Sequence, residues 1–486
     1  KIPTAKLVNN SGNQNINKKV FLQAKYFFLE RLLQVIIVFG ILILFSLRLS
    51  KENYGLYQGS WVFINLFAPL LFLGLPQQLL TLPGNGAISH FFWLLKKYFP
   101  YYVTAVLIFI TTLFFLHQKF SNALLICIFI CTLFQSVMLL MDNLVIKLNA
   151  DLLFLKQNFL YSLLFLALHY AWLYAETDMV WLVVGIAFIG FLKSAAYFLF
   201  IRKLNLGVHL EVADTLYFEK QWKLLSLNEI LNRFTTHADK LAIIFLLSIS
   251  GFSVYYNGTY ELPFFAMLVS ALGNSLSVQL SNNNTGAKSA AALFKQSIVT
   301  GSSVAFPLFF FFYIFSTPVF QFFFNGKYMD SIPLFNIAIF IAFLRVTNFA
   351  VILQVFKKNH TILFGSIIDL LVNIGTVLLL YPFWGINAFP AGFVIGTAFQ
   401  IAYYIFKTKK LINAGIPDLI PLTWILALIV ALTLFYSLLF YILQPLQTWA
   451  IIAIAAIITT AIIYLLTHFF GSKINNKKTV TSLEHE

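Results

Sequence analysis

About fourteen apolar blocks, most of them close to twenty residues long, follow one another along this sequence. An α-helix rises about 1.5 Å per residue, so one such block crosses the roughly 30 Å hydrocarbon core of a bilayer. Only 10% of the residues are charged, whereas ordinary globular domains carry about 25%. The alternation of apolar and polar residues that barrel strands show is missing. The sequence therefore predicts an all-α integral membrane protein with about 14 transmembrane helices.

The apolar blocks also predict where each transmembrane helix lies. They place the spans at residues 28–48, 61–82, 99–116, 123–145, 159–174, 180–201, 224–246, 263–280, 294–315, 332–354, 361–382, 387–406, 422–443 and 449–470. Spans one to six would form a first six-helix lobe (21–201) and spans seven to twelve a second (224–406), joined by a cytoplasmic linker at 202–223. Two C-terminal helices (407–470) would follow, and polar cytoplasmic tails would occupy 1–20 and 471–486.

A faint internal repeat favours this two-lobe arrangement. The stretch Tyr54-Gly55-Leu56-Tyr57 after span one resembles Phe252-Ser253-Val254-Tyr255 after span seven. Many secondary transporters build two lobes around a central site from such repeated halves. Chance similarity between apolar helices is the alternative explanation.

Basic residues predict the orientation of the chain. Lys and Arg outnumber Asp and Glu by 32 to 17. Most of them fall in the N-terminal tail, in alternate loops and in the C-terminal tail, and Lys193, Arg202 and Lys203 are assigned to the loop after span six. Because cytoplasmic loops are rich in Lys and Arg, this asymmetry predicts both termini in the cytoplasm. It accounts for the net charge of +15 without a nucleic acid partner.

Span seven is the richest of the predicted spans in ionisable residues. Such residues cost at least about 2.5–3.5 kcal/mol each near the bilayer centre, and they usually face a protein interior or a wet cavity. Two neighbouring stripes at helical spacing carry Glu229, Arg233, His237 and Lys240, and Asn228, Asn232, Thr236 and Asp239. This polar face predicts a cavity wall. The alternative is a Glu229–Arg233 ion pair in a span that begins later.

Three other spans carry charged residues at depth. Arg345 lies near the middle of span ten with Asn348 close by, and it is predicted to bind substrate or to form a buried ion pair. Asp369 in span eleven would bind a coupling ion or pair with an arginine. Asp142, near the end of span four, is interpreted as an interfacial residue.

Spans one and two carry candidate binding and gating residues. Arg31 stands beside Glu30 and one turn from Gln34, close enough to the cytoplasmic end for snorkelling to be the alternative role. Pro69 and Pro76 in span two each remove a backbone hydrogen bond and can kink the helix. A kinked helix between lobes suits a gate, although proline is also common in membrane spans without such a role.

Several motifs that would indicate other functions are missing. The sequence has no GxxxxGK[ST] phosphate loop, no HExxH motif and no Cys/His cluster. Cys127 and Cys131, one turn apart in an apolar block, are interpreted as buried free thiols. We therefore expect a transporter and not an enzyme, with no catalytic residues, no metal and no cofactor other than a coupling H⁺ or Na⁺.

Three segments carry patterns that occur together in one transporter family. Residues 49–80 (LSKENYGLYQGSWVFINLFAPLLFLGLPQQLL) contain an acidic-aromatic-Gly-x-Tyr turn and a Gly-x-Pro exit. Residues 238–258 (ADKLAIIFLLSISGFSVYYNG) carry an Asp-Lys pair and a second Tyr-rich turn, where Ser253 replaces the usual Gly. Residues 322–335 (FFFNGKYMDSIPLF) are similar to the external segment before span ten. The chain thus resembles the O-antigen-type polysaccharide flippases of the multidrug/oligosaccharidyl-lipid/polysaccharide (MOP) exporter superfamily.

This resemblance implies a function. Such flippases move isoprenyl (undecaprenyl) pyrophosphate-linked oligosaccharide across the bacterial cytoplasmic (inner) membrane by alternating access, for surface polysaccharide biosynthesis. Their expected partners are the lipid-linked substrate, membrane lipids and polysaccharide-assembly proteins. The head group would be held by Arg31, Arg233, Arg345, Lys240, Gln34, Asn232 and Asn348, and transport would be coupled to an ion through Glu229, Asp239, Asp369 and Glu30. Two alternatives stay open: an H⁺/Na⁺-coupled drug or metabolite antiporter of the same fold, and a membrane-embedded transferase acting on lipid-linked sugars.

Overall fold

The computed structural model describes residues 31–73, 75, 93–94, 96–148, 150–175, 177–203, 212–282, 287–347 and 349–483. Within these ranges the chain is helical and contains no strand. Nine helical segments of the described part are long and apolar enough to cross a membrane. This confirms the predicted all-α membrane fold, while the count of fourteen spans stays a prediction.

The chain forms two compact units. Unit 1 comprises Lys1–Arg48 and Leu56–Ile230, and unit 2 comprises Leu49–Gly55 and Leu231–Glu486. Helices α2 (Lys51–Leu70) and α9 (Val212–Leu246) each contribute residues to both units.

Unit 1 is built from long apolar helices. Besides its parts of α2 and α9 it contains the helix Arg31–Arg48, α5 (Phe99–Phe114), α6 (Asn122–Lys147), α7 (Asp151–Ala175) and α8 (Met179–Lys203). Helix α8 packs extensively against α6 and also against α7. The N-terminus of α6 is capped by Ser121, whose hydroxyl oxygen accepts a hydrogen bond from the Leu124 N–H at 3.3 Å.

A buried histidine lies in the aromatic core of unit 1. The Nδ1 atom of His169 donates to the Phe165 carbonyl at 2.7 Å, so Nε2 is the acceptor for the Tyr57 hydroxyl at 3.0 Å. The Phe45 ring packs beside it, with centroids 5.4 Å apart, and the Trp172 ring packs against Phe45. The histidine is thus satisfied structurally, with both ring nitrogens in use.

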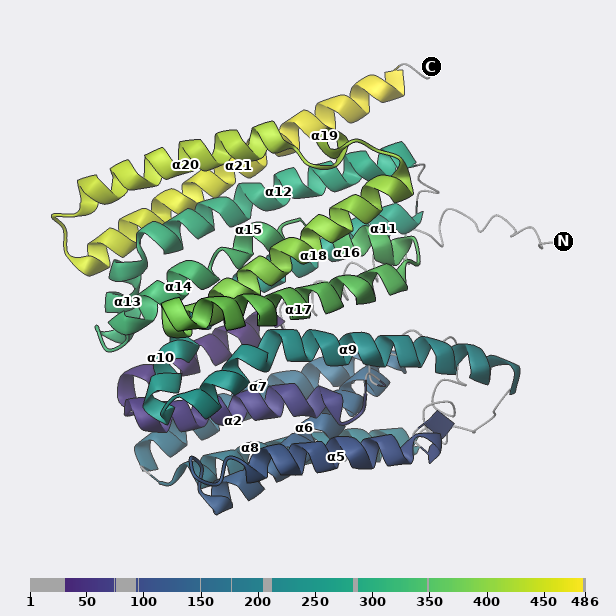
Figure 1. The fold of residues 1–486 in the computed structure, drawn as a ribbon, viewed down its shortest axis with the longest axis vertical. Helices are drawn as coiled ribbons and strands as arrows, with labels where there is room; N and C mark the ends of the chain where they lie inside the picture. The colour runs from purple at the N-terminus through teal and green to yellow at the C-terminus, as the bar shows by residue number, and fades with distance from the viewer. Residues whose placement is uncertain are drawn as a thin grey trace. The chain divides into compact units, whose positions relative to one another are not determined.

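Unit 2 contains most of the remaining helices. They are α10 (Ile249–Thr259), α11 (Pro263–Asn282), α12 (Ala287–Ile314), α13 (Ser316–Phe324), η1 (Met329–Ser331), α14 (Ile332–Ala338), α15 (Ile341–Arg345), α16 (Phe349–Val355), α17 (Asn359–Trp384), η2 (Gly385–Asn387), α18 (Ala388–Ile412), α19 (Ile416–Leu419), α20 (Leu422–Leu443) and α21 (Thr448–Leu483). Helices α17 and α18 form its most extensive helix pair, and α12 packs against both α20 and α21 (Figure 1).

The three segments that carry the flippase resemblance meet in unit 2. The Tyr54 hydroxyl donates to the Asn257 side-chain oxygen at 2.8 Å, and the Tyr54 ring lies 5.8 Å from the Tyr328 ring. A Cβ atom on Gly55 would lie 2.3 Å from the Ile249 carbonyl oxygen, so only glycine permits this approach. These patterns therefore hold the fold together and do not by themselves indicate a substrate.

Several stretches expected as loops are helical. Helix α2 begins at Lys51 instead of 61, α10 lies in the expected loop 247–262, and α9 merges the expected linker with span seven. Serine caps explain two of these early starts. The Ser50 hydroxyl accepts from the Asn53 N–H at 3.1 Å, and the Ser248 hydroxyl accepts from the Gly251 N–H at 3.1 Å.

Candidate functional site

Unit 2 contains a partly open cavity of about 370 Å³ that is lined by both polar and apolar side chains. It is lined by residues of α9, α11, α15, α16, α17 and α18, with Thr347 between α15 and α16. The lining residues are Asn232, Thr235, Thr236, Val269, Leu344, Arg345, Thr347, Phe349, Ala350, Asp369, Phe393, Thr397, Gln400, Ile401 and Tyr404. Three residues predicted from the sequence, Asn232, Arg345 and Asp369, therefore come together in one place. Ligand pockets typically have volumes of about 300–1,000 Å³.

Arg345 lies at a break in the helix expected over residues 332–354. The chain there forms three short helices, α14, α15 and α16, and Arg345 is the last residue of α15. Around the breaks the backbone makes tighter i→i−3 hydrogen bonds, such as Phe343 N–H to the Phe340 carbonyl at 3.1 Å. Irregular backbone at membrane depth is tolerated where it lines a cavity, and this break lies at the cavity wall.

The Arg345 guanidinium has two direct partners. Its Nη1 donates to Oε1 of Glu261, and the guanidinium carbon lies 5.6 Å from the Phe393 ring centroid. An ion pair is therefore present, although it is not the buried pair considered for Arg345, and the side chain also lines the cavity. The two side chains are about equally exposed, 30% for Arg345 and 33% for Glu261.

Asp369 faces the cavity from α17. Its Oδ1 is buried and has no hydrogen-bond partner within the described part of the chain. A Cβ atom on Gly396 would lie 2.6 Å from this oxygen, so the glycine of α18 makes room for the carboxylate. The positive charge of Arg345 acts on Asp369 through space. A buried carboxylate with an open coordination position can take a proton or a small cation.

Helix α9 contributes neutral polar groups to the cavity. Asn232, Thr235 and Thr236 line it, and the Ser366 hydroxyl of α17 lies 3.5 Å from the Asn232 side-chain oxygen. Asp239 and Lys240 pair with each other at 3.3 Å, and the Tyr255 hydroxyl donates to Asp239 at 2.7 Å. These two charges, predicted to act on ion and substrate, are not among the residues that line the cavity.

The structure places the remaining candidates elsewhere. Glu229 is buried and Arg233 half-buried on α9, and neither lines the cavity. Arg31 is exposed on the first helix, as the snorkelling alternative requires, and Pro69 is half-buried in the last turn of α2. Glu30, Asn348 and Pro76 lie outside the described residues.

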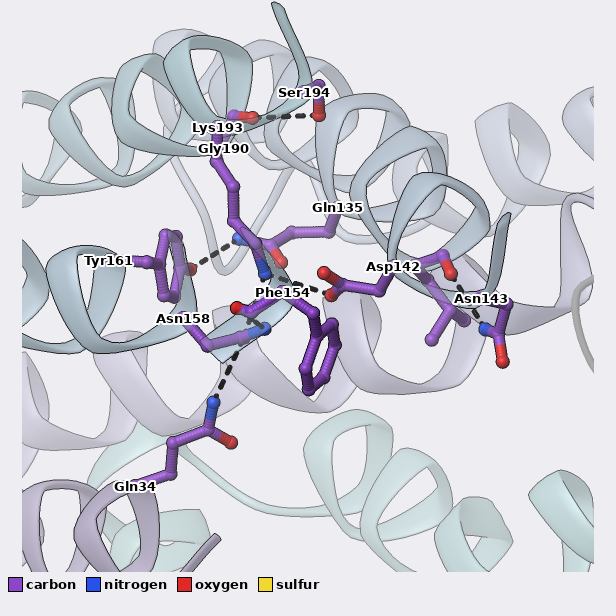
Figure 2. A network of polar contacts seen from close by, with 11 residues as sticks. Gln34, Gln135, Asp142, Asn143, Phe154, Asn158, Tyr161, Gly190, Lys193 and Ser194 are labelled. Atoms are coloured by element: carbon purple, nitrogen blue, oxygen red, sulfur yellow. Dashed lines mark hydrogen bonds and ion pairs between the residues drawn. The ribbon is translucent and has the colours of Figure 1, made fainter. Parts of the chain in front are cut away.

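A second set of charges lies inside unit 1. Lys193 reaches from α8 between α6 and α7, where its ammonium donates to Asp142 Oδ2 and to Asn158 Oδ1, both at 2.9 Å (Figure 2). Gln34 of the first helix donates to the same Asn158 oxygen at 3.3 Å. The ammonium also lies 5.2 Å from the Tyr161 ring centroid. This network joins four helices of unit 1.

One interpretation of this network made from the sequence was wrong. Lys193 was assigned to a cytoplasmic loop, but its side chain is buried, with 3% exposure. Asp142, which was interpreted as interfacial, is the partner of that buried ammonium. The signal was present, because Lys193 falls within the predicted span 180–201 and a lysine there needs a partner.

A charge cluster joins the start of α5 to α9 in unit 1. Glu219 accepts hydrogen bonds from the Lys97 ammonium at 2.6 Å, from the Tyr98 hydroxyl, and from the Lys223 ammonium at 2.9 Å. The hydrogen bonds from Lys97 and Tyr98 lower the pKa of Glu219 to about 2. Nearby, the Trp222 indole donates to the Leu73 carbonyl at 2.9 Å, so α9 is tied to the segment after α2.

No family model matches the sequence, and no curated protein does. The solved structure of lipid II flippase MurJ in an inward closed conformation is similar, with a TM-score of 0.68 and 12% identity over 94% of this chain and 100% of that chain. An inward-facing multidrug resistance MATE family transporter of the MOP superfamily has a TM-score of 0.55 and 15% identity over 78% of this chain and 94% of that chain. The chain therefore shares its fold with these two transporters, as its sequence predicted.

Proposed function

We propose that the chain is a flippase that moves isoprenyl-pyrophosphate-linked oligosaccharide across the bacterial cytoplasmic membrane by alternating access. The observation that carries this proposal is the cavity of unit 2, where Arg345 and Asp369 lie among neutral hydrogen-bonding side chains. The similarity in fold to a lipid II flippase supports it, since that protein is named for a lipid-linked substrate.

The cavity offers a chemistry that fits a pyrophosphate-sugar head group. Arginine presents a planar fork of N–H donors that binds phosphate oxygens in pairs, so Arg345 would hold the pyrophosphate. Asn232, Thr236 and Gln400 supply neutral donors and acceptors for sugar hydroxyls. The isoprenyl chain would remain in the lipid, where it is already solvated.

Asp369 would couple transport to an ion. A carboxylate oxygen that is buried without a hydrogen-bond partner gains from binding H⁺ or Na⁺. Neutralising Asp369 would also remove a negative charge that repels the pyrophosphate. Ion and substrate occupancy would in this way be linked within one cavity.

A cation-coupled drug or metabolite antiporter is the second candidate. The open oxygen of Asp369 and the similarity in fold to a MATE family transporter favour it. If the chain is such an antiporter, Asp369 would carry the function and Arg345 would be a structural partner of Glu261. A transferase acting on lipid-linked sugars is tested separately, by incubating purified protein with a sugar donor.

Complementation tests the flippase. In a strain lacking this gene, the wild-type chain restores surface polysaccharide, whereas Arg345→Ala does not although it reaches the membrane in equal amount. Arg345→Lys restores part of it, because lysine keeps the charge but not the paired donors. Arg202→Ala, which removes an exposed arginine at the end of α8, serves as the matched control. Full restoration by Arg345→Ala contradicts the proposed role of this residue.

A further inference from the structure

We propose that Glu261 is an exchangeable counter-ion of Arg345, which substrate phosphate displaces on binding and which displaces the phosphate again on release. This inference rests on the proposed function. Glu261 lies outside the predicted spans, and its proposed role is to set how tightly the substrate binds and how fast it is released.

The position of Glu261 suits an exchange. The residue lies in the short connection between α10, which ends at Thr259, and α11, which begins at Pro263. In the predicted topology this connection is on the outer side of the membrane. Arg345 is the last residue of α15, and Val346 and Thr347 after it lie in a turn and a bend and not in a helix. Both partners are thus at places where a side chain can change partner without unfolding a helix.

The contact itself leaves Arg345 available to a second anion. The ion pair joins Nη1 of Arg345 to Oε1 of Glu261, whereas a guanidinium has five N–H donors. The Phe393 ring, whose centroid lies 5.6 Å from the guanidinium carbon, lines the same cavity. A phosphate entering the cavity can therefore approach the free donors before the bond to Glu261 breaks.

Exposure sets how strongly Glu261 competes. About a third of each side chain is exposed, so both charges are partly hydrated and the pair is weaker than a buried one. A pyrophosphate diester carries two negative charges and can accept paired hydrogen bonds, so it binds Arg345 more strongly than one carboxylate does. After crossing, the hydrated outer side weakens the phosphate contact, and Glu261 can recapture the guanidinium.

The loss of Glu261 should therefore separate binding from turnover. Without its competing carboxylate, Arg345 binds the pyrophosphate more tightly, by about two- to fivefold if the pair contributes as exposed pairs do. Release then becomes slower, so that both KM and kcat fall. A residue that only supported the fold would lower the amount of folded protein without tightening binding.

The test uses the full chain purified in lipid nanodiscs with farnesyl pyrophosphate as the probe and farnesol as the uncharged control. Wild type, Glu261→Gln, Glu261→Asp, Arg345→Ala and Asp330→Asn are compared by calorimetry, after size-exclusion chromatography shows that each is folded. Asp330→Asn removes a carboxylate that is 80% exposed and pairs with Lys51 at 3.7 Å, so it is the matched control. Substrate flipping by each variant in vesicles supplies KM and kcat.

The expected result is tighter probe binding by Glu261→Gln, near-wild-type binding by Glu261→Asp and Asp330→Asn, and binding about tenfold or more weaker in Arg345→Ala. Unchanged or weaker binding by folded Glu261→Gln, with loss in Arg345→Ala, overturns the counter-ion role and leaves the proposed function standing. Unchanged binding in Arg345→Ala overturns the phosphate site itself. If Glu261→Gln does not fold, Glu261→Ala is measured with and without added acetate. Tighter probe binding without acetate, and wild-type affinity with it, support the counter-ion role. Equal affinity in both conditions contradicts the counter-ion role.

Discussion

Removing the buried ammonium of unit 1 should destabilise the protein strongly. Lys193 is 3% exposed and its ammonium lies 2.9 Å from both Asp142 Oδ2 and Asn158 Oδ1. Lys193→Met leaves the Asp142 carboxylate, whose Oδ1 already has no hydrogen-bond partner in the described residues, without a counter-charge. Breaking a buried ion pair on one side typically costs about 3–5 kcal/mol. Because Asp142 is 18% exposed, we expect the lower end, about 3 kcal/mol.

The double variant separates the charge from the packing. Replacing both partners of a buried pair is often close to neutral, so Lys193→Met with Asp142→Asn should lie within about 1 kcal/mol of wild type. The assay is equilibrium unfolding in mixed detergent micelles of wild type, both single variants and the double variant. The reasoning is refuted if Lys193→Met unfolds like wild type, or if the double variant is no more stable than either single one.

Two further predictions concern particular contacts. The pKa of Glu219 is lowered from 4.5 to about 2, so its ion pairs with Lys97 and Lys223 stabilise the fold fully above about pH 5. This contribution to stability is lost as the pH falls toward 2. Thermal unfolding of Glu219→Gln should show no such loss of stability between about pH 5 and pH 2. A Cβ on Gly396 would lie 2.7 Å from the Asp369 carbonyl oxygen, so Gly396→Ala should destabilise the fold by about 1–3 kcal/mol and impair transport. Gly375→Ala is the control and should do neither, because the space around Gly375 is open. Equal stability of the two variants in unfolding assays contradicts this explanation.

The sequence was sufficient for the fold class because apolar length is a local property. The blocks that contain α6 or α17 could be assigned from hydropathy alone, since any helix of that length and composition spans a bilayer. Asn232, Arg345 and Asp369 were also found from sequence, because a polar group at membrane depth must face a cavity or a partner.

The partners of these charges could not be found in this way. Glu261 lies 84 residues from Arg345 and Lys193 lies 51 residues from Asp142, so tertiary packing decides each pair. The break around Arg345 was equally hidden, because the stretch from Ile337 to Val346 is continuously apolar apart from this arginine. Its β-branched residues lower helix propensity only slightly, and its tertiary contacts, such as that of Phe343 with Phe309 at 4.0 Å between ring centroids, join residues far apart in the sequence.

The ion-coupling and gating assignments remain predictions. Glu229, Asp239 and Asp369 were treated alike from sequence, yet of these Asp369 lines the cavity, while Asp239 is engaged by Lys240 and Tyr255. Titrating transport by Asp369→Asn against sodium and pH therefore takes priority among the three. A dependence on either ion that is lost in this variant supports the coupling role.

The central claim is that this chain carries lipid-linked oligosaccharide through the Arg345 cavity. The most direct measurement locates isoprenyl-pyrophosphate-linked oligosaccharide in the two leaflets of a strain lacking the gene, complemented with wild type or with Arg345→Ala. We expect accumulation on the cytoplasmic leaflet with Arg345→Ala and in the uncomplemented strain, and clearance with wild type. Normal amounts on both leaflets in the uncomplemented strain, with no second flippase present, would contradict it and favour the antiporter.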